Sequence, residues 1–281
     1  MTRDSWLEAH PYLRPMADLS AQVDRAASAV DVLAVRIPNW EDYRADFLAG
    51  VPLLSCAEAG VDLEPGGRMA IALVQRLASG TSPEWLEVEA RALDAELRNE
   101  PHASRRIADF LLGPASPLGD EPLTLSFPGL LRFLGWTAMA RYLHPVVNAF
   151  SGWRNEEQWL RRYCPTCGSL PAMAQLAGSD PGRMRMLSCG CCGTRWQFKR
   201  TGCPFCETDA QKLASVTIEE EPGLRIAHCE SCGGYLKTYD GQGSESFWLS
   251  DWSSLHLDLI AHDRGFKRMA VSLYEFDLHP T

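Results

Sequence analysis

Four closely spaced pairs of cysteines constrain the fold of this chain more than any other feature. Each pair has the form Cys-x-x-Cys, and the pairs are Cys164/Cys167, Cys189/Cys192, Cys203/Cys206 and Cys229/Cys232. The first two pairs are separated by 21 residues and the last two by 22. The string Cys-Pro-Thr-Cys-Gly of the first pair returns 39 residues later as Cys-Pro-Phe-Cys-Glu, and the fourth pair follows the second by 40 residues. An internal repeat built around cysteine pairs indicates two related metal-binding modules.

The spacing within and between the pairs has a chemical reason. A Cys-x-x-Cys turn directs two thiolates toward one point and aims backbone N–H groups at the sulfurs, so two facing turns complete a tetrahedral site. The glycines that follow Cys167, Cys192 and Cys232 allow the chain to turn tightly there. The intervening residues suit a β-hairpin, which is the plan of zinc ribbons and rubredoxin knuckles. We therefore predict that all eight cysteines bind two metal ions.

The sequence predicts the metal ligands more firmly than it predicts which cysteine pairs share a metal ion or which metal they bind. The repeat favours sequential pairing, in which the first and second pairs share one metal and the third and fourth share the other. Interleaved pairing, as in cross-braced modules, is the alternative. Four thiolates suit zinc, which would be structural, or iron, which could be redox-active. Either site would be closed to water and substrate, and this argues against metal-assisted hydrolysis.

The cysteines are metal ligands in this interpretation rather than disulfides or redox pairs. Nine of the ten lie between residues 164 and 232, whereas disulfide scaffolds are short, secreted and cysteine-rich throughout. A thioredoxin-like site needs one Cys-x-x-Cys pair, not four. Cys191 is interpreted as a small thiol in a turn and Cys56 as a core residue. His228 is disfavoured as a substitute ligand because its counterpart in the repeat is Ser188.

The net charge and the hydropathy limit the partners and the cellular compartment that we expect for this chain. The net charge of the 281 residues is -9, and residues 161–240 carry ten basic and eight acidic side chains, so that window is only +2. Nucleic-acid binders usually carry a basic excess, so this class is disfavoured. The N-terminus lacks the apolar core of a signal peptide, and no run of about 20 apolar residues could span a membrane. We expect a cytoplasmic protein without membrane insertion, and the oligomeric state is left open.

The pattern of apolar residues changes near residue 160. Helical periodicity predicts helices at 17–37, 69–77, about 82–98, 103–112, 129–150 and 153–163. Thr81 or Ser82 is expected to cap the third of these, and Pro145 to kink or end the fifth. Short strands are expected at 185–187, 194–199, 213–218, 224–228 and 235–239, and a helical pattern returns at 250–263.

These elements predict an α+β fold in four segments. An N-terminal helical bundle (1–160) precedes two tandem rubredoxin-like or zinc-ribbon-like β-hairpin modules (161–200 and 201–240), and a helical tail (241–281) packs back on the body. The sequence contains no Walker A, Gly-x-Gly-x-x-Gly, Gly-x-Ser-x-Gly or His-Glu-x-x-His motif that would point to an active site. With two closed metal sites, an enzyme is therefore not expected.

The cysteine strings resemble those of a known family. Cys-Pro-Thr-Cys-Gly-Ser-Leu-Pro (164–171), Leu-Ser-Cys-Gly-Cys-Cys-Gly-Thr-Arg-Trp (187–196), Cys-Pro-Phe-Cys (203–206) and Cys-Glu-Ser-Cys-Gly-Gly-Tyr-Leu-Lys (229–237) resemble the FdhE family of formate dehydrogenase accessory, or formation, proteins. The resemblance implies a non-catalytic cytoplasmic factor that binds the catalytic subunit of respiratory formate dehydrogenase before its export by the twin-arginine route. It also implies iron in rubredoxin-like sites, with all eight paired cysteines as ligands and no family role for Cys191.

Two other functions are compatible with the same motifs. Zinc ribbons often bind nucleic acid, although the acidic balance counts against this reading. A rubredoxin-like electron carrier or redox sensor would need iron that changes oxidation state.

Overall fold

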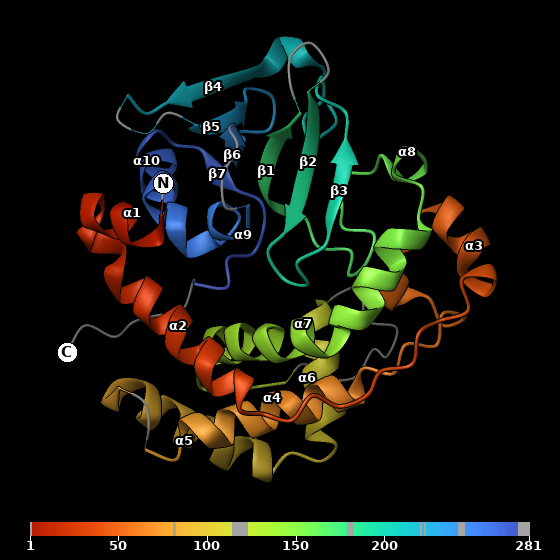
Figure 1. Ribbon diagram of the computed structural model, residues 1–281, viewed down its shortest axis with the longest axis vertical. Coiled ribbons are helices and arrows are strands. Elements are labelled where there is room, and N and C mark those ends of the chain that lie inside the picture. The colour runs from red at the N-terminus through yellow and green to blue at the C-terminus, as the bar shows by residue number, and fades with distance from the viewer. Residues whose placement is uncertain are drawn as a thin grey trace. The chain divides into compact units, whose positions relative to one another are not determined.

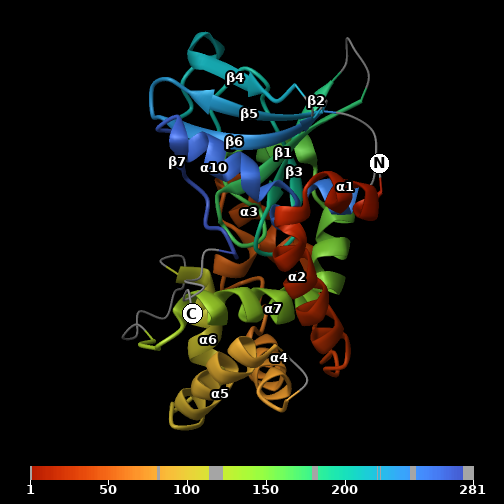
Figure 2. The same cartoon turned by 90° about the vertical axis from the view of Figure 1, so that its left-hand side faces the viewer.

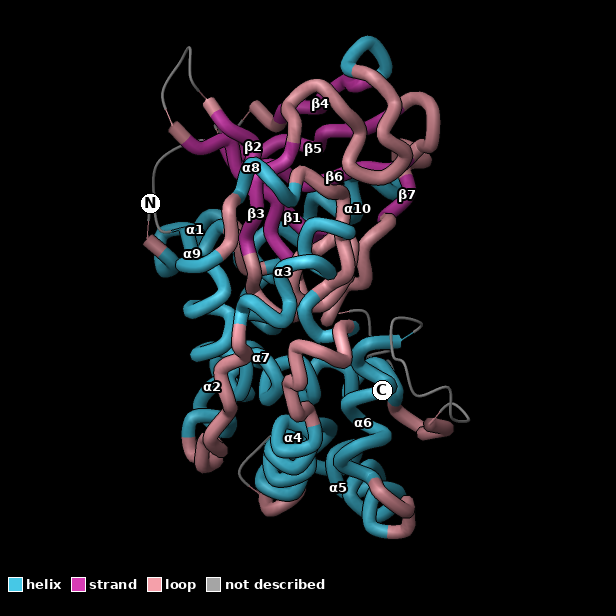
Figure 3. Tube along the Cα trace, turned by 90° about the vertical axis from the view of Figure 1, so that its right-hand side faces the viewer, coloured by secondary structure: helices cyan, strands magenta, loops and turns pink. Residues whose placement is uncertain are grey.

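The computed structural model describes residues 2–80, 83–113, 123–178, 183–219, 221, 223–240 and 245–274. The chain divides into two compact units. Unit 1 contains residues 1–17, 155–165 and 169–272, and unit 2 contains residues 18–154, 166–168 and 273–281. Figure 1 shows the course of the chain, and the strands coloured magenta in Figure 3 all belong to unit 1.

Unit 2 is helical, as the apolar periodicity predicts. Its elements are α2 (Arg14–Ser28, which begins in unit 1), α3 (Trp40–Ala49), the 3-10 turn η2 (Leu53–Ser55), α4 (Glu64–Leu77), α5 (Glu84–Arg98), α6 (Ala103–Leu112) and α7 (Pro128–Trp153). α2 ends nine residues before the predicted end at residue 37. The helix α3 was not predicted from the sequence, and the expected caps at Thr81 and Ser82 lie outside the described residues. No helix of the described ranges combines the length and apolar character needed to cross a bilayer.

Two helices of unit 2 differ from their predicted boundaries. α4 begins at Glu64, five residues before the predicted start at residue 69, and includes the Pro65-Gly66-Gly67 segment. Pro65 is tolerated in the first turn, where its missing N–H is not needed. A Cβ at Gly67 would lie 1.9 Å from the carbonyl oxygen of Ser104, so glycine permits this close approach. α7 also continues past Pro145 to Trp153 rather than ending there.

Unit 1 is organised around one seven-stranded sheet (Figure 2). The strand order is β3-β2-β1-β6-β5-β4, and β7 pairs with β6. The strands are β1 (Pro171–Ala177), β2 (Met184–Cys189), β3 (Arg195–Phe198), β4 (Leu213–Thr217), β5 (Leu224–Cys229), β6 (Gly234–Asp240) and β7 (Lys267–Arg268). Strands adjacent in sequence pair antiparallel within β1-β2-β3 and within β4-β5-β6.

The two cysteine modules are not separate domains in the structure. β1 of the first module pairs parallel with β6 of the second, with Met173 opposite Lys237 and Gln175 opposite Tyr239. The pairing joins two three-stranded meanders into a single sheet. β1 was missed in the sequence because its residues do not alternate in polarity: the first five are all buried, as is common for a strand covered on both faces.

The N-terminus belongs to the sheet unit rather than to the helical bundle. α1 (Arg3–Ala9), which the sequence analysis did not predict, begins with a capping box between Thr2 and Ser5. The indole Nε1 of Trp6 donates to the carbonyl oxygen of Ser253 at 2.9 Å, and its ring meets Trp248 at 4.8 Å. Unit 1 also contains η1 (Pro11–Leu13), α8 (Glu156–Trp159), η4 (Ala210–Lys212), α9 (Glu245–Trp248), η5 (Asp251–Ser254) and α10 (Leu255–Asp263). The division into units thus differs from the four segments expected along the sequence.

Candidate metal centres

The eight paired cysteines gather in two groups of four. Within each group, the sulfur atoms all lie within 4.8 Å of one another, and the groups are Cys164/Cys167/Cys189/Cys192 and Cys203/Cys206/Cys229/Cys232. The structure therefore brings the first pair to the second and the third to the fourth. This is the sequential arrangement, and the interleaved alternative is not formed.

The spacing of the sulfur atoms fits a tetrahedral metal ion. The Sγ–Sγ distances are 3.5 Å for Cys164–Cys192, 3.8 Å for Cys203–Cys232 and 3.7 Å for Cys206–Cys229. A metal–sulfur bond of about 2.3 Å gives a tetrahedron with edges of about 3.8 Å. A disulfide would instead place two sulfurs about 2.05 Å apart, and all ten cysteines are free thiols. The donor set is therefore suitable for two ions of the zinc or iron type.

Each Cys-x-x-Cys turn has the local geometry of a knuckle. The backbone N–H groups of Cys164, Cys189 and Cys203 each donate, at 2.9 Å, to the carbonyl oxygen five residues later. N–H groups also point at sulfur: those of Cys191, Phe205 and Gly234 lie 3.4 Å from the Sγ atoms of Cys189, Cys203 and Cys232, respectively. Such contacts stabilise a thiolate before and after a metal binds.

The residue after each knuckle is in the left-handed region. Gly168, Gly193 and Gly233 have φ values of +78°, +74° and +70°, as expected from the glycines in the sequence. The fourth position holds Glu207, with φ +62°. A side chain is disfavoured in this conformation, so the third knuckle holds a backbone geometry that its sequence does not favour.

The two groups differ in exposure. All four cysteines of the first group are buried, and none is more than 5% exposed. In the second group Cys203 and Cys229 are buried, Cys232 is partly exposed and Cys206 is exposed. A metal ion in the second group would therefore be closer to solvent through Cys206.

The thiols of the second group differ in acidity because their surroundings differ. Burial raises the pKa of Cys203 to about 12. Burial also acts to raise the pKa of Cys229, but the backbone N–H groups of Cys232 and Ser231 outweigh it and lower that pKa to about 7. A divalent cation at the centre of the group would compensate the negative charge that the buried Cys203 disfavours on its own.

Cysteine and histidine residues outside the two groups have other environments. Cys191 is half-buried, accepts a contact from the hydroxyl of Ser169 at 3.7 Å, and belongs to neither group. Cys56 is 7% exposed, and burial raises its pKa to about 11. The imidazole of His228 stacks on Phe266 with ring centroids 4.1 Å apart, and it does not join the sulfur atoms.

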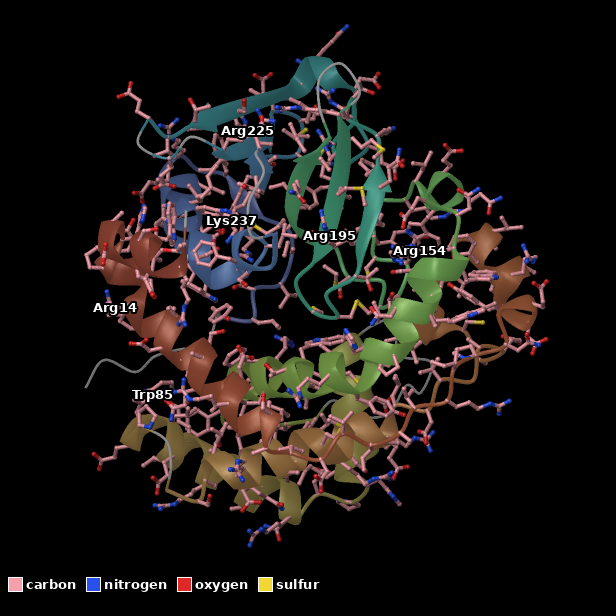
Figure 4. All side chains as sticks on the ribbon, viewed as in Figure 1. Arg14, Trp85, Arg154, Arg195, Arg225 and Lys237 are labelled. Carbon is pink, nitrogen blue, oxygen red and sulfur yellow. The ribbon has the colours of Figure 1, made fainter. Side chains whose placement is uncertain are left out.

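The aromatic and basic residues near the knuckles are used inside unit 1. Trp196 is fully buried and donates to the carbonyl oxygen of Arg161, and Tyr235 donates to Asp258 at 2.6 Å. Arg185 donates to the carbonyl oxygens of Gly202 and Arg200. Arg195 on β3, labelled in Figure 4, donates to Gln175 on β1. These contacts make packing, rather than a recognition surface, the main role of these side chains.

Two clusters in unit 1 were not found by sequence reasoning. One joins Lys237 to Asp251 and Asp258, and the other joins His10, Glu221 and His256. The residues of the second cluster are 35 to 246 positions apart, and no motif links them. Only the fold brings them together, so no local sequence signal could have identified them.

The helices of unit 2, the joined sheet of unit 1 and the two four-cysteine groups define an α+β protein of the knuckle-type metal-binding class. Residues 163–200 match the family model described as "FdhE, central domain". This match covers part of the chain, and it shows the similarity of that part to the FdhE family.

The chain is also similar to curated relatives and to a solved structure. Proteins named "Protein FdhE" from Escherichia coli O1:K1 / APEC and from Shigella boydii serotype 18 are each 28% identical to the chain over 144 residues. These alignments cover 50% of the chain and 47% of each relative, so the match spans about half the length of these curated proteins. The crystal structure of the FdhE protein from Pseudomonas aeruginosa has a TM-score of 0.62 and 22% identity, over 92% of this chain and 89% of that one. It shares the fold.

Proposed function

We propose that this chain is an accessory factor for the assembly of respiratory formate dehydrogenase. In this proposal it acts in the cytoplasm, does not catalyse a reaction, and binds the catalytic subunit of the enzyme before export. The support comes from the family to which the motifs and the comparisons point. The accessory role is consistent with a chain whose most specific sites are closed groups of thiols.

The observation that carries the proposal is the geometry of the two four-cysteine groups. We propose that the eight cysteines each supply one thiolate, and that each group holds one iron or zinc ion. Four sulfur atoms at the corners of a tetrahedron fill all four coordination positions and leave none for a substrate. When bound, the metal supplies a cross-link between two knuckles and, if it is iron, a one-electron redox couple. The chain supplies the thiolates and the N–H groups that stabilise them.

One observation supports electron transfer as a second candidate function. Cys206 is exposed, whereas every cysteine of the first group is buried. A ligand sulfur at the surface would give an electron a short path to a redox partner. Nucleic-acid binding has less support, because arginines near the knuckles donate to carbonyl and amide oxygens of their own unit.

The accessory role can be tested in an organism that makes both this chain and respiratory formate dehydrogenase. Deleting the gene should abolish formate dehydrogenase activity, and the wild-type gene should restore it. A variant with Cys203→Ala and Cys206→Ala should not restore it, whereas Cys191→Ala, at a cysteine outside both groups, should. Tagged wild-type chain should also retain the catalytic subunit on purification. Unchanged activity in the deletion strain would contradict the proposal.

Metal analysis separates the two candidates. Anaerobically purified chain should contain two equivalents of metal, and an absorption spectrum will show whether they are iron. A colourless protein with two zinc ions would exclude electron transfer while leaving the accessory role intact. If iron is found, reversible reduction in the visible spectrum is the further requirement for a carrier.

A further inference from the structure

A third group of possible ligands lies in unit 1 and shares no residue with the cysteine groups. It consists of His10, Glu221 and His256, whose ligand atoms all lie within 4.8 Å of one another. His10 follows α1, Glu221 precedes β5 and His256 lies in the first turn of α10. All three side chains are at most 10% exposed. In Figure 1 the three elements are the red helix at the N-terminus and the two blue segments labelled β5 and α10.

The carboxylate of Glu221 lies between the two imidazoles. Its Oε1 atom is 2.9 Å from Nε2 of His10, and its Oε2 atom is 2.7 Å from Nε2 of His256. Both imidazole rings therefore direct Nε2 at the carboxylate of Glu221. Three donor atoms from three separate segments converge on one point below the surface.

The hydrogen bonds of His10 determine which of its nitrogens carries a proton. Nδ1 lies 3.0 Å from the carbonyl oxygen of Trp6, and a carbonyl oxygen can only accept, so Nδ1 is protonated. In the neutral ring, Nε2 then presents a lone pair toward a carboxylate oxygen. Two negative regions at 2.9 Å are stable only if a positive charge lies between them. That charge is either a proton shared between the ring and the carboxyl group or a metal ion.

The surroundings of His10 match those of a metal-bound histidine. Protein ligands of this type usually donate their other N–H to a carbonyl or carboxylate, which fixes the tautomer and the ring orientation. Trp6 contributes this carbonyl, and its indole also stacks on the imidazole at 3.7 Å. Tyr12, which is exposed, lies edge-on to both imidazoles at 5.8 and 6.1 Å, so the group is next to solvent.

We propose that His10 Nε2, His256 Nε2 and the Glu221 carboxylate bind a divalent first-row transition-metal ion. Two imidazoles and one carboxylate suit zinc, cobalt, nickel or ferrous iron. The buried carboxylate neutralises one of the two charges of the ion. This site has three protein ligands and therefore leaves a coordination position for water, whereas each four-cysteine group leaves none. The ion would tie the N-terminal helix to β5 and α10 of the same unit, and the site is independent of the proposed accessory role.

The test uses the full chain with both cysteine groups filled by zinc. Cobalt(II) is then added in a calorimetric and spectroscopic titration, because cobalt binds thiolate sites more weakly than zinc and will not displace it. Wild-type chain should take up one further equivalent. Its spectrum should show weak visible bands and no sulfur-to-cobalt charge transfer.

Two substitutions should weaken this third ion. Glu221→Gln keeps the size of the side chain but removes its charge, and His256→Gln removes a nitrogen ligand. Each should raise the dissociation constant of the third ion at least tenfold. Even changes to residues that only contact a metal ligand cost about 10–100-fold in metal affinity. His262→Gln is the matched control, since His262 lies on the same helix α10 with a side chain that is 90% exposed. It should leave the titration unchanged.

The outcomes are distinct. If the zinc-loaded wild-type chain takes up no cobalt, the proposal is contradicted, and a proton shared between His10 and Glu221 holds the cluster together. A third ion that binds Glu221→Gln as tightly as wild type also contradicts it and places the ion elsewhere. If circular dichroism shows that His256→Gln does not fold, the isosteric Glu221→Gln and the wild-type stoichiometry decide the question.

Discussion

The ammonium group of Lys237 lies 2.6 Å from Oδ1 of Asp251, inside unit 1, with the lysine side chain only 1% exposed. The same Nζ atom lies 2.7 Å from Oδ2 of Asp258. Arg268 contacts both carboxylates, at 2.9 Å for Asp251 and 2.7 Å for Asp258. Figure 4 labels Lys237 on β6, among the blue segments that include α10. Two cations and two anions thus form a charge-balanced network that connects β6, η5, α10 and β7.

Removing the charge of Lys237 should destabilise unit 1 strongly. Lys237→Met keeps most of the apolar stem but leaves Asp251 and Asp258 with one cation fewer in a buried setting. Breaking a buried pair from one side costs about 3–5 kcal/mol. Urea unfolding of the metal-loaded chain should show a loss of this size. Lys212→Met, at an exposed lysine, is the control and should change the free energy of unfolding by less than about 0.5 kcal/mol.

The same network should make stability depend on pH through Asp251. Burial acts to raise the pKa of this carboxyl, but the charges of Lys237 and Arg268 outweigh it and hold the pKa well below its ordinary value. A carboxyl with a lowered folded pKa stabilises the fold above its unfolded pKa of about 3.9 and loses that contribution as the pH falls. Asp251→Asn should therefore be less stable than wild type at pH 7.

The stability difference between wild type and Asp251→Asn should then narrow as the pH falls below about 4. Comparing the two proteins removes the acid sensitivity of the metal sites, which both share. Urea unfolding at pH 7, 5, 4 and 3 would measure the difference. Asp263→Asn, whose carboxylate is 85% exposed, is the control and should track wild type at every pH. A difference that stays constant down to pH 3 would show that Asp251 does not titrate with the fold.

Local sequence signals predicted what depends on neighbours along the chain. The α6 boundaries at residues 103 and 112 follow from apolar spacing and the Gly113 stop, and the cysteine groups follow from the spacing of the pairs. The parallel pairing of β1 with β6 could not be predicted, because Met173 and Lys237 meet only through the fold. Lys237 was seen only as the end of a motif string. Nothing around it in the sequence indicates a buried charge, since its partners Asp251 and Asp258 follow 14 and 21 residues later.

Replacing Glu207 with glycine should stabilise the fold, although glycine usually destabilises folded proteins. The residue has φ +62°, where a side chain costs about 1–2 kcal/mol, and glycine loses about 0.5–1 kcal/mol of this gain to the entropy of the unfolded chain. Glu207→Gly should therefore raise the free energy of unfolding of the metal-loaded chain by about 0.5–1 kcal/mol. The exposed contact of Glu207 with Arg162, at 3.8 Å, contributes little.

Gly193→Ala is the reciprocal change at the equivalent position of the second knuckle. Gly193 has φ +74°, and a Cβ there would meet nothing within 4 Å, so only backbone strain is introduced. It should lower the free energy of unfolding by about 1 kcal/mol. The contrary result is that Glu207→Gly lowers the free energy of unfolding and Gly193→Ala leaves it unchanged. This result would show that the knuckles do not hold these conformations in solution.

The two metal ions should leave at different rates when a chelator is added. Every cysteine of the first group is buried, whereas Cys206 of the second is exposed, so a chelator can approach the second ion through that ligand. With zinc in both groups, release to a coloured chelator should be biphasic, with one equivalent in each phase. Cys206→Ser should remove the fast phase and leave the slow phase intact, because the first group does not use that residue. Cys191→Ser, a change at a cysteine outside both groups, should retain both phases. If Cys206→Ser instead removed the slow phase, exposure of the ligand sulfur would not be what controls metal release.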